Sequence, residues 1–212
     1  MKTDELIRAM AADAKRHSMP LDTAWQVAAA LAVLIAGAVF LATLGPRPDA
    51  LASLETARFV FKFVVTLTLA ASAFALLRAL SRPGGNVRSL MPWLLAAPLA
   101  LAAAVGLELL AVPSSQWAAR LIGANSRLCL TFIPLIGAGP LALFLLALRH
   151  GAPIRPALSG AVAGLLAGGL AAAFYAAHCP DDSPLFVATW YSIAILGLAA
   201  IGALLAPRLA RW

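Results

Sequence analysis

Two cysteines and a short polar stretch are the residues of this chain whose types could do chemistry. Cys129 is one of only two cysteines among the 212 residues. The other lies in a polar stretch that holds His178, Cys179, Asp181 and Asp182. Two thiols that meet can form a disulfide or bind a soft metal ion, and a protonated histidine nearby lowers a thiol pKa. The pattern predicts thiol chemistry, tuned by the histidine and the two aspartates, if the fold brings the cysteines together.

The elements that must position these residues are membrane-spanning helices. Hydrophobic residues make up 62% of the chain and charged residues 12%, against roughly 45–50% and about 25% in soluble domains. The apolar residues form six continuous runs rich in Ala and Leu, each near the length that a bilayer requires. We therefore predict an all-α polytopic membrane protein, a bundle of six transmembrane helices with short loops. The spans are expected at about residues 25–44, 59–80, 91–112, 128–148, 156–177 and 185–206.

A polar segment, residues 1–22, precedes the six-span domain of residues 23–212. Leu6, Ile7 and Met10 recur at helical spacing, with acidic residues in the first turn and basic residues in the last, which favours a short amphipathic helix. A helix of this length is marginal alone and needs a partner surface. The segment carries acids and lacks a small-residue cleavage site, so we do not expect a cleaved signal peptide.

The distribution of Lys and Arg predicts that both termini are cytoplasmic. With the N-terminus inside, the inner segments hold eleven of the sixteen basic residues and the outer segments five, which is the bias of the positive-inside rule. This asymmetry accounts for the net charge of +7, so we infer no direct nucleic-acid partner. The outer loops are then about residues 45–58, 113–127 and 178–184, and the polar stretch faces outside.

The helix geometry predicts that the two cysteines lie at a similar depth. Spans four and five are antiparallel around an inner turn near Ala152, with Cys129 23 residues before it and Cys179 27 residues after it. At about 1.5 Å of rise per residue, the two depths agree to about one turn. Helices joined by a short loop usually lie side by side, so the thiols could reach disulfide distance in an oxidising outer compartment. Small residues in span five would allow a close neighbour, namely Gly160, Gly164 and Gly168.

Two other interpretations of the cysteines stay open at this stage. A cysteine in an apolar span is commonly a small buried hydrophobe with no chemical role. Alternatively, Cys129, Cys179, His178 and Asp181 could bind a soft metal ion, although no regular metal-site spacing supports this.

The remaining features exclude some classes of function. No catalytic motif occurs, and a membrane thiol oxidoreductase would need a second thiol pair, so we do not expect an enzyme. Lys62 and Glu108 lie near the outer ends of spans two and three, where we expect them to reach the surface or to pair with each other. A small membrane transporter or metal exporter is the main alternative function.

Three stretches carry a family resemblance. They are the opening MKTDELI of residues 1–7, the RLCL of residues 127–130, and the HCPDDSP of residues 178–184 with Trp190 and Tyr191 behind it. Together they resemble NrsF-type proteins, which are six-span anti-sigma factors of the bacterial inner membrane. The resemblance extends over the whole chain and is most specific in the two cysteine segments.

The resemblance implies a regulatory role in transcription and stress response. It implies an inner-membrane protein that holds an extracytoplasmic-function sigma factor and releases it on heavy-metal or oxidative stress. The signal would be sensed by Cys129 and Cys179 on the periplasmic side. No resident cofactor is expected, only a transient heavy-metal ion at these two thiols.

We add a hypothesis of our own about how partners would bind. We expect Leu6, Ile7 and Met10 to dock into an apolar groove of the sigma factor, with Asp4 and Arg8 beside them. Membrane lipid is a further expected partner. A second copy of the chain could bind through the glycines of span five.

Overall fold

The computed structural model describes residues 3–5, 7 and 19–209, which form helices and short connections with no strand among them. Six helices are long and apolar enough to cross a membrane, so the predicted all-α bundle of six spans is confirmed. These spans are α2 (Leu21–Thr43), α4 (Ala57–Leu80), the run Val87–Ala111, α8 (Ser126–Leu148), α9 (Pro156–Ala176) and the run Pro184–Leu209.

Two of the spans combine several helical segments. The third contains α5 (Val87–Leu90), the 3-10 segment η1 (Met91–Leu95) and α6 (Ala96–Ala111). The sixth contains α10 (Pro184–Phe186), the π-helical turn η3 (Val187–Tyr191) and α11 (Ser192–Leu209). Short helices in the loops are α3 (Ala50–Ser53), η2 (Ser114–Gln116) and α7 (Trp117–Ile122). A π-helical turn inside a longer helix often marks a functional region.

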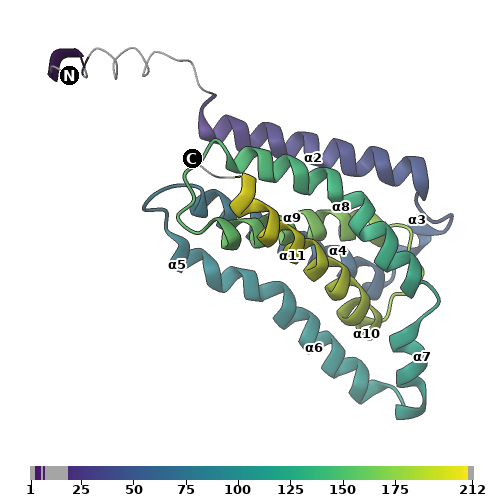
Figure 1. Cartoon of the computed structure of the whole chain (residues 1–212). Helices are drawn as coiled ribbons and strands as arrows, with labels where there is room; N and C mark the ends of the chain where they lie inside the picture. The colour runs from purple at the N-terminus through teal and green to yellow at the C-terminus, as the bar shows by residue number, and fades with distance from the viewer. Residues whose placement is uncertain (1–2, 6, 8–18, 210–212) are drawn as a thin grey trace.

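Helix α9 occupies the middle of the bundle. It contacts α2, α4, α8 and α11 and is the most buried of the six spans, whereas the span of α6 is the least buried and lies at the periphery (Figure 1). The beginning of α2 and the end of α11 lie at one end of the bundle, and α3 and α7 lie at the other (Figure 1). The loops that follow α2, α6 and α9 therefore gather at the end away from the start of α2.

Close contact between α9 and α11 depends on small residues. A Cβ atom on Gly160 would lie 2.1 Å from the carbonyl oxygen of Gly202, and one on Gly164 would lie 2.3 Å from that of Leu198. Packing of this closeness is a main source of helix association within a bilayer. The glycines of span five, Gly160, Gly164 and Gly168, thus pack against span six of the same chain.

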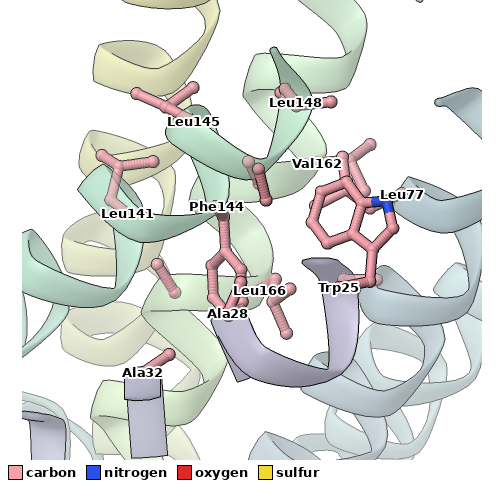
Figure 2. Packing of buried hydrophobic residues seen from close by; sticks show 14 of the residues in the cluster. Trp25, Ala28, Ala32, Leu77, Leu141, Phe144, Leu145, Leu148, Val162 and Leu166 are labelled. Atoms are coloured by element: carbon pink, nitrogen blue, oxygen red, sulfur yellow. The ribbon is translucent and has the colours of Figure 1, made fainter. Parts of the chain in front are cut away.

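Buried hydrophobic side chains form two clusters, one toward each end of the bundle. At the end where α2 begins, Trp25 stacks on Phe144 of α8 with ring centroids 6.5 Å apart and meets the edge of Phe74 of α4 at 6.3 Å. Figure 2 shows Trp25 beside Leu77 of α4 within this cluster. The second cluster, at the opposite end, contains both cysteines. The fold therefore places the thiols in packed protein interior near the loops that follow α2, α6 and α9.

Candidate functional site

Both cysteines are free, completely buried thiols in one cluster. Cys129 lies in the first turns of α8, and Cys179 lies just after the end of α9. The side chains of Tyr175, Phe186 and Tyr191 belong to the same cluster. The rings of the two tyrosines lie 5.7 Å apart, edge to face. These aromatic side chains help to keep water from the two thiols, which lie in the same buried cluster.

A buried lysine binds the polar stretch at Cys179 and Asp182. Lys62 of α4 is 0% exposed. Its ammonium donates to the carbonyl oxygen of Cys179 at 2.7 Å and lies 2.5 Å from a carboxylate oxygen of Asp182. A buried charge is tolerated only when it is paired and hydrogen-bonded. Lys62 therefore fixes the backbone of Cys179 and the carboxylate three residues later at the same time.

Arg47 makes a second set of contacts with the same segment. Its guanidinium lies 3.4 Å from the carboxylate of Asp182 and donates to the carbonyl oxygen of Cys179 at 3.4 Å. It also binds Ser53 and lies over the ring of Phe59, with 4.7 Å to the ring centroid. The carboxylate of Asp182 is thus shared by two cations, Arg47 from the loop after α2 and Lys62 from α4. The loop around α3 is tied to the polar stretch through this arrangement.

Glu108 secures the other end of the polar stretch. Its side chain is only 2% exposed, accepts hydrogen bonds from the Ser183 hydroxyl at 2.7 Å and the Leu185 N–H at 3.1 Å, and pairs with Arg120 at 3.1 Å. The carboxylate caps the first turn of α10, a favourable position for a negative charge. Arg58 lies farther from it, at 3.8 Å.

The prediction that Lys62 and Glu108 reach the surface or pair with each other is wrong. Both side chains are buried, and each binds the polar stretch through a different partner. The reason is geometric: residues between Cys179 and Leu185 lie between the two helices and offer closer partners.

Asp181 and His178 anchor the stretch to two other loops. The Asp181 carboxylate accepts from the backbone N–H of Ala124 at 3.1 Å and of Asn125 at 2.9 Å. Gly123 allows this approach, because its φ is +58° and an added Cβ would lie within 2.9 Å of Asp181. Nδ1 of His178 lies 3.0 Å from the carbonyl oxygen of Gly45, so that nitrogen carries the proton. All three polar residues named by the sequence thus have protein partners.

The electrostatic surroundings keep Cys179 protonated. Burial raises the pKa of the Cys179 thiol, and the positive charge of Lys62 only partly offsets that effect. Reactivity requires the thiolate, so a buried thiol of this kind is inert until it becomes exposed. His178, which points to Gly45, is not among the groups that lower this pKa. The closed arrangement therefore protects the thiol.

A polar cleft lies against this segment. It has a volume of about 410 Å³ and is lined by Arg58, Arg120, Gly123 and residues 180–183, with Gln116 and Ala119. The cleft reaches the polar stretch but not the sulfur atoms, which are fully buried. Small reagents can thus approach residues 180–183, which follow Cys179, without a large rearrangement.

No cluster of candidate metal ligands occurs among the residues that the structure describes. Within residues 3–5, 7 and 19–209, no three His, Cys, Asp or Glu side chains form a group that could hold a metal ion. The two thiols are soft donors, but His178 and Asp181 are engaged with backbone groups of other loops.

The N-terminal residues expected to bind a partner are only partly described. Asp4 and Ile7 are helical and exposed, and Ile7 is 58% exposed. Leu6, Arg8 and Met10 lie outside the described residues. The segment leads into α2, whose first turn carries Asp22, and the carboxylate of Asp22 binds Arg78 at 2.5 Å and also binds Arg82.

Sequence reasoning missed the ion-pair partners of the polar stretch. Arg47, Lys62 and Glu108 are the residues that hold it closed. One signal was present: the outer segments carry five basic and five acidic residues, and balanced charges at the edge of a bilayer core tend to pair. The particular partners depend on which helices are neighbours, which the charge pattern does not state.

Comparisons with known proteins cover nearly the whole chain. Residues 10–212 match the family described as "Negative regulator of sigma F" (NrsF). The chain is 37% identical over 216 residues to the anti-sigma-F factor NrsF of Caulobacter vibrioides and 35% identical over 216 residues to a probable anti-sigma-F factor NrsF of Azospira oryzae, with full coverage of both chains in each case. No solved structure matches. The family is named for regulation and not for catalysis, and the chain belongs to this family of negative regulators of sigma F.

Proposed function

We propose that this chain is an inner-membrane anti-sigma factor with both termini in the cytoplasm. It holds an extracytoplasmic-function sigma factor and releases it when a heavy metal or an oxidant reacts with Cys129 and Cys179 on the periplasmic side. Support for the sigma factor as partner comes from the family and from relatives named as anti-sigma-F factors. Support for the sensor comes from two free thiols in one buried cluster next to the outer loops.

The observation that carries the sensor role is the burial of both thiols in one cluster. Each thiol is 0% exposed, both belong to one buried cluster, and the segment that follows Cys179 is held by ion pairs. A peroxide would oxidise the pair with balanced chemistry: both S–H bonds break, an S–S bond forms, and the two electrons cleave the O–O bond to give two waters. A soft divalent metal ion would instead replace one proton on each sulfur. Either product changes the packing around the stretch that Lys62 holds.

The sigma-binding site is proposed at the cytoplasmic N-terminal segment. Leu6, Ile7 and Met10 would form the apolar face of a helix that docks into a groove, with Asp4 and Arg8 at its polar edge. The exposure of Ile7 agrees with an unpartnered apolar face in the free chain. A sigma factor bound in this way is withheld from RNA polymerase, so binding lowers the concentration of free sigma factor.

A reporter experiment tests this proposal. Cells that carry a promoter dependent on the cognate sigma factor are supplied with the wild-type chain, with Cys129→Ser/Cys179→Ser, or with a chain that lacks residues 2–16. We expect the wild-type chain to silence the reporter until cadmium or diamide is added. The double serine variant should silence it under both conditions, and the truncated chain should not silence it at all. A double serine variant that responds like wild type would refute the thiol sensor, and a truncated chain that still silences would move the contact to the inner loops.

A further inference from the structure

Helix α4 has ionic contacts with other parts of the chain at both of its ends. Near its outer end, Lys62 binds Asp182 and the carbonyl oxygen of Cys179. Near its inner end, Arg78 and Arg82 bind Asp22. The same helix therefore touches the segment that covers the thiol and the residue at which the N-terminal segment enters the bundle.

The outer contact makes the position of α4 sensitive to the polar stretch. Lys62 is 0% exposed, and both of its polar partners belong to residues 179–182. If a reaction at Cys179 moves this stretch, the ammonium loses both partners while it is still buried. An unpaired buried charge is strongly destabilising, so Lys62 must move toward water or toward the displaced carboxylate. Either movement pulls on the outer half of α4.

The inner contact seats the beginning of α2 on α4. Asp22 lies in the first turn of α2 and is bound by two arginines of α4 and its following turn. Three residues later, Trp25 is fully buried against Phe74 and lies beside Leu77, as Figure 2 shows. A shift of the inner half of α4 would therefore reposition the first turn of α2 and the N-terminal segment joined to it.

The two contacts are joined by one uninterrupted α-helix. α4 runs from Ala57 to Leu80 without a proline or a glycine, the residues that most often bend helices. Lys62 and Arg78 are separated by sixteen residues, or about 24 Å along the axis. Displacement at one end is thus carried to the other without an internal hinge.

We infer that α4 couples the polar stretch outside to the first turn of α2 inside, with Lys62 as the positioning residue at the outer contact and the Asp22–Arg78–Arg82 cluster as the inner contact. This inference rests on the proposed function for its physiological meaning, because it supplies the route from thiol to sigma-binding segment. The coupling itself is a property of the chain alone. By linkage, a change at the inner contact must alter the outer segment as much as the reverse.

The test measures the outer segment while the inner contact is changed. Full-length chains with Cys129→Ser, so that Cys179 is the sole thiol, are kept in sealed membrane vesicles, and the rate of Cys179 alkylation by a maleimide is measured. Because the thiol is fully buried, this rate reports how often the segment opens. The inner variants are Asp22→Asn and, as a charge-retaining control, Asp22→Glu. Arg88→Gln is a second control, since Arg88 has no ion pair with any residue of the described ranges.

The coupling predicts a specific pattern of rates. Lys62→Met or Asp182→Asn should raise alkylation at least about tenfold, because the buried pair is broken directly. Asp22→Asn should raise it roughly two- to fivefold, the range that an exposed ion pair can contribute. Asp22→Glu and Arg88→Gln should match the parent chain. Asp22 is half exposed, so its substitution leaves the core intact.

Two results would overturn the inference. Alkylation unchanged by Asp22→Asn, while Lys62→Met raises it, would show that the two contacts are independent. Alkylation unchanged by both outer variants would show that Lys62 does not hold the segment. Neither result depends on sigma binding, so the two proposals can fail separately. If Asp22→Asn raises alkylation, the coupling is supported. If the same chain binds no sigma factor, the proposed function is refuted.

Discussion

Glu108 offers a sharp test of how the outer end of the bundle is held together. Its carboxylate is 2% exposed and accepts two hydrogen bonds from the start of the sixth span, the Ser183 hydroxyl at 2.7 Å and the Leu185 N–H at 3.1 Å. Replacement by alanine leaves both donors without this acceptor. Replacement by glutamine keeps the shape and one acceptor oxygen but removes the charge.

The expected loss of stability follows from these contacts. A hydrogen bond to a charged group contributes roughly 1.5–3 kcal/mol, so the two bonds together account for about 3–6 kcal/mol in Glu108→Ala. The ion pair with Arg120 adds only about 0–1 kcal/mol, because Arg120 is partly exposed and its charge can be solvated. Ordered water can take over part of this bonding, so we expect a net loss of about 3 kcal/mol. Glu108→Gln should lose about half as much.

Thermal unfolding of the purified chain in detergent measures this effect. For a protein of this size, 1 kcal/mol corresponds to roughly 2–4 °C in Tm, so Glu108→Ala should unfold about 6–12 °C below wild type. The thiols are convenient reporters, since both are fully buried and react with a fluorogenic maleimide far faster in the unfolded chain than in the folded one. All variants are compared at one heating rate, because unfolding in detergent is often irreversible.

The matched control is Glu55→Ala, which removes an exposed glutamate from the same outer side of the bundle. It should unfold within about 1 °C of wild type, as surface substitutions usually do. A Glu108→Ala variant that unfolds as late as this control would contradict the assignment of Glu108 as the residue that secures the sixth span.

Three further predictions concern the thiol, the helix contacts and the topology. Because burial raises the pKa of Cys179, the thiolate forms only at high pH. Alkylation of Cys179 in the folded chain should therefore keep rising tenfold per pH unit past pH 9, and a plateau near pH 8.5, as in a free thiol, would contradict this. Gly160→Ala should lower Tm by roughly 2–10 °C because its Cβ would meet the Gly202 carbonyl oxygen. Gly106→Ala, where the added atom meets nothing within 4 Å, should be neutral or slightly stabilising; equal effects of the two would refute the close contact. Reporter fusions should place both termini in the cytoplasm, and alkaline phosphatase activity at either terminus would reverse the proposed orientation.

The number and type of helices could be predicted from the sequence because a bilayer imposes a simple rule. Long apolar runs must be helical, since every backbone polar group needs an internal partner. The placement of Cys129 and Cys179 toward one end of the bundle could also be predicted, because the rise per residue and the antiparallel connection fix their approximate depth. Both features depend only on residue spacing along a helix, which is the same in the folded chain.

Features that depend on neighbours across the bundle were not accessible in the same way. The glycines of span five predict a close contact but do not say with which helix, and the structure shows that α11 fills that face. Lys62 and Glu108 were expected to satisfy each other or to reach the surface, yet a loop from elsewhere in the chain provides their partners. Side-chain pairing depends on the arrangement of all six spans, which local patterns do not specify.

Sensing by the two thiols is tested most directly by measuring whether their oxidation releases a bound sigma factor. The complex of the full-length chain and its cognate sigma factor, held in lipid nanodiscs, is titrated with diamide while bound sigma factor and disulfide content are measured on the same samples. We expect sigma release to rise in proportion to the Cys129–Cys179 disulfide and to be reversed by a dithiol reductant. Full disulfide formation with the sigma factor still bound, or equal release from Cys129→Ser/Cys179→Ser, would contradict this expectation.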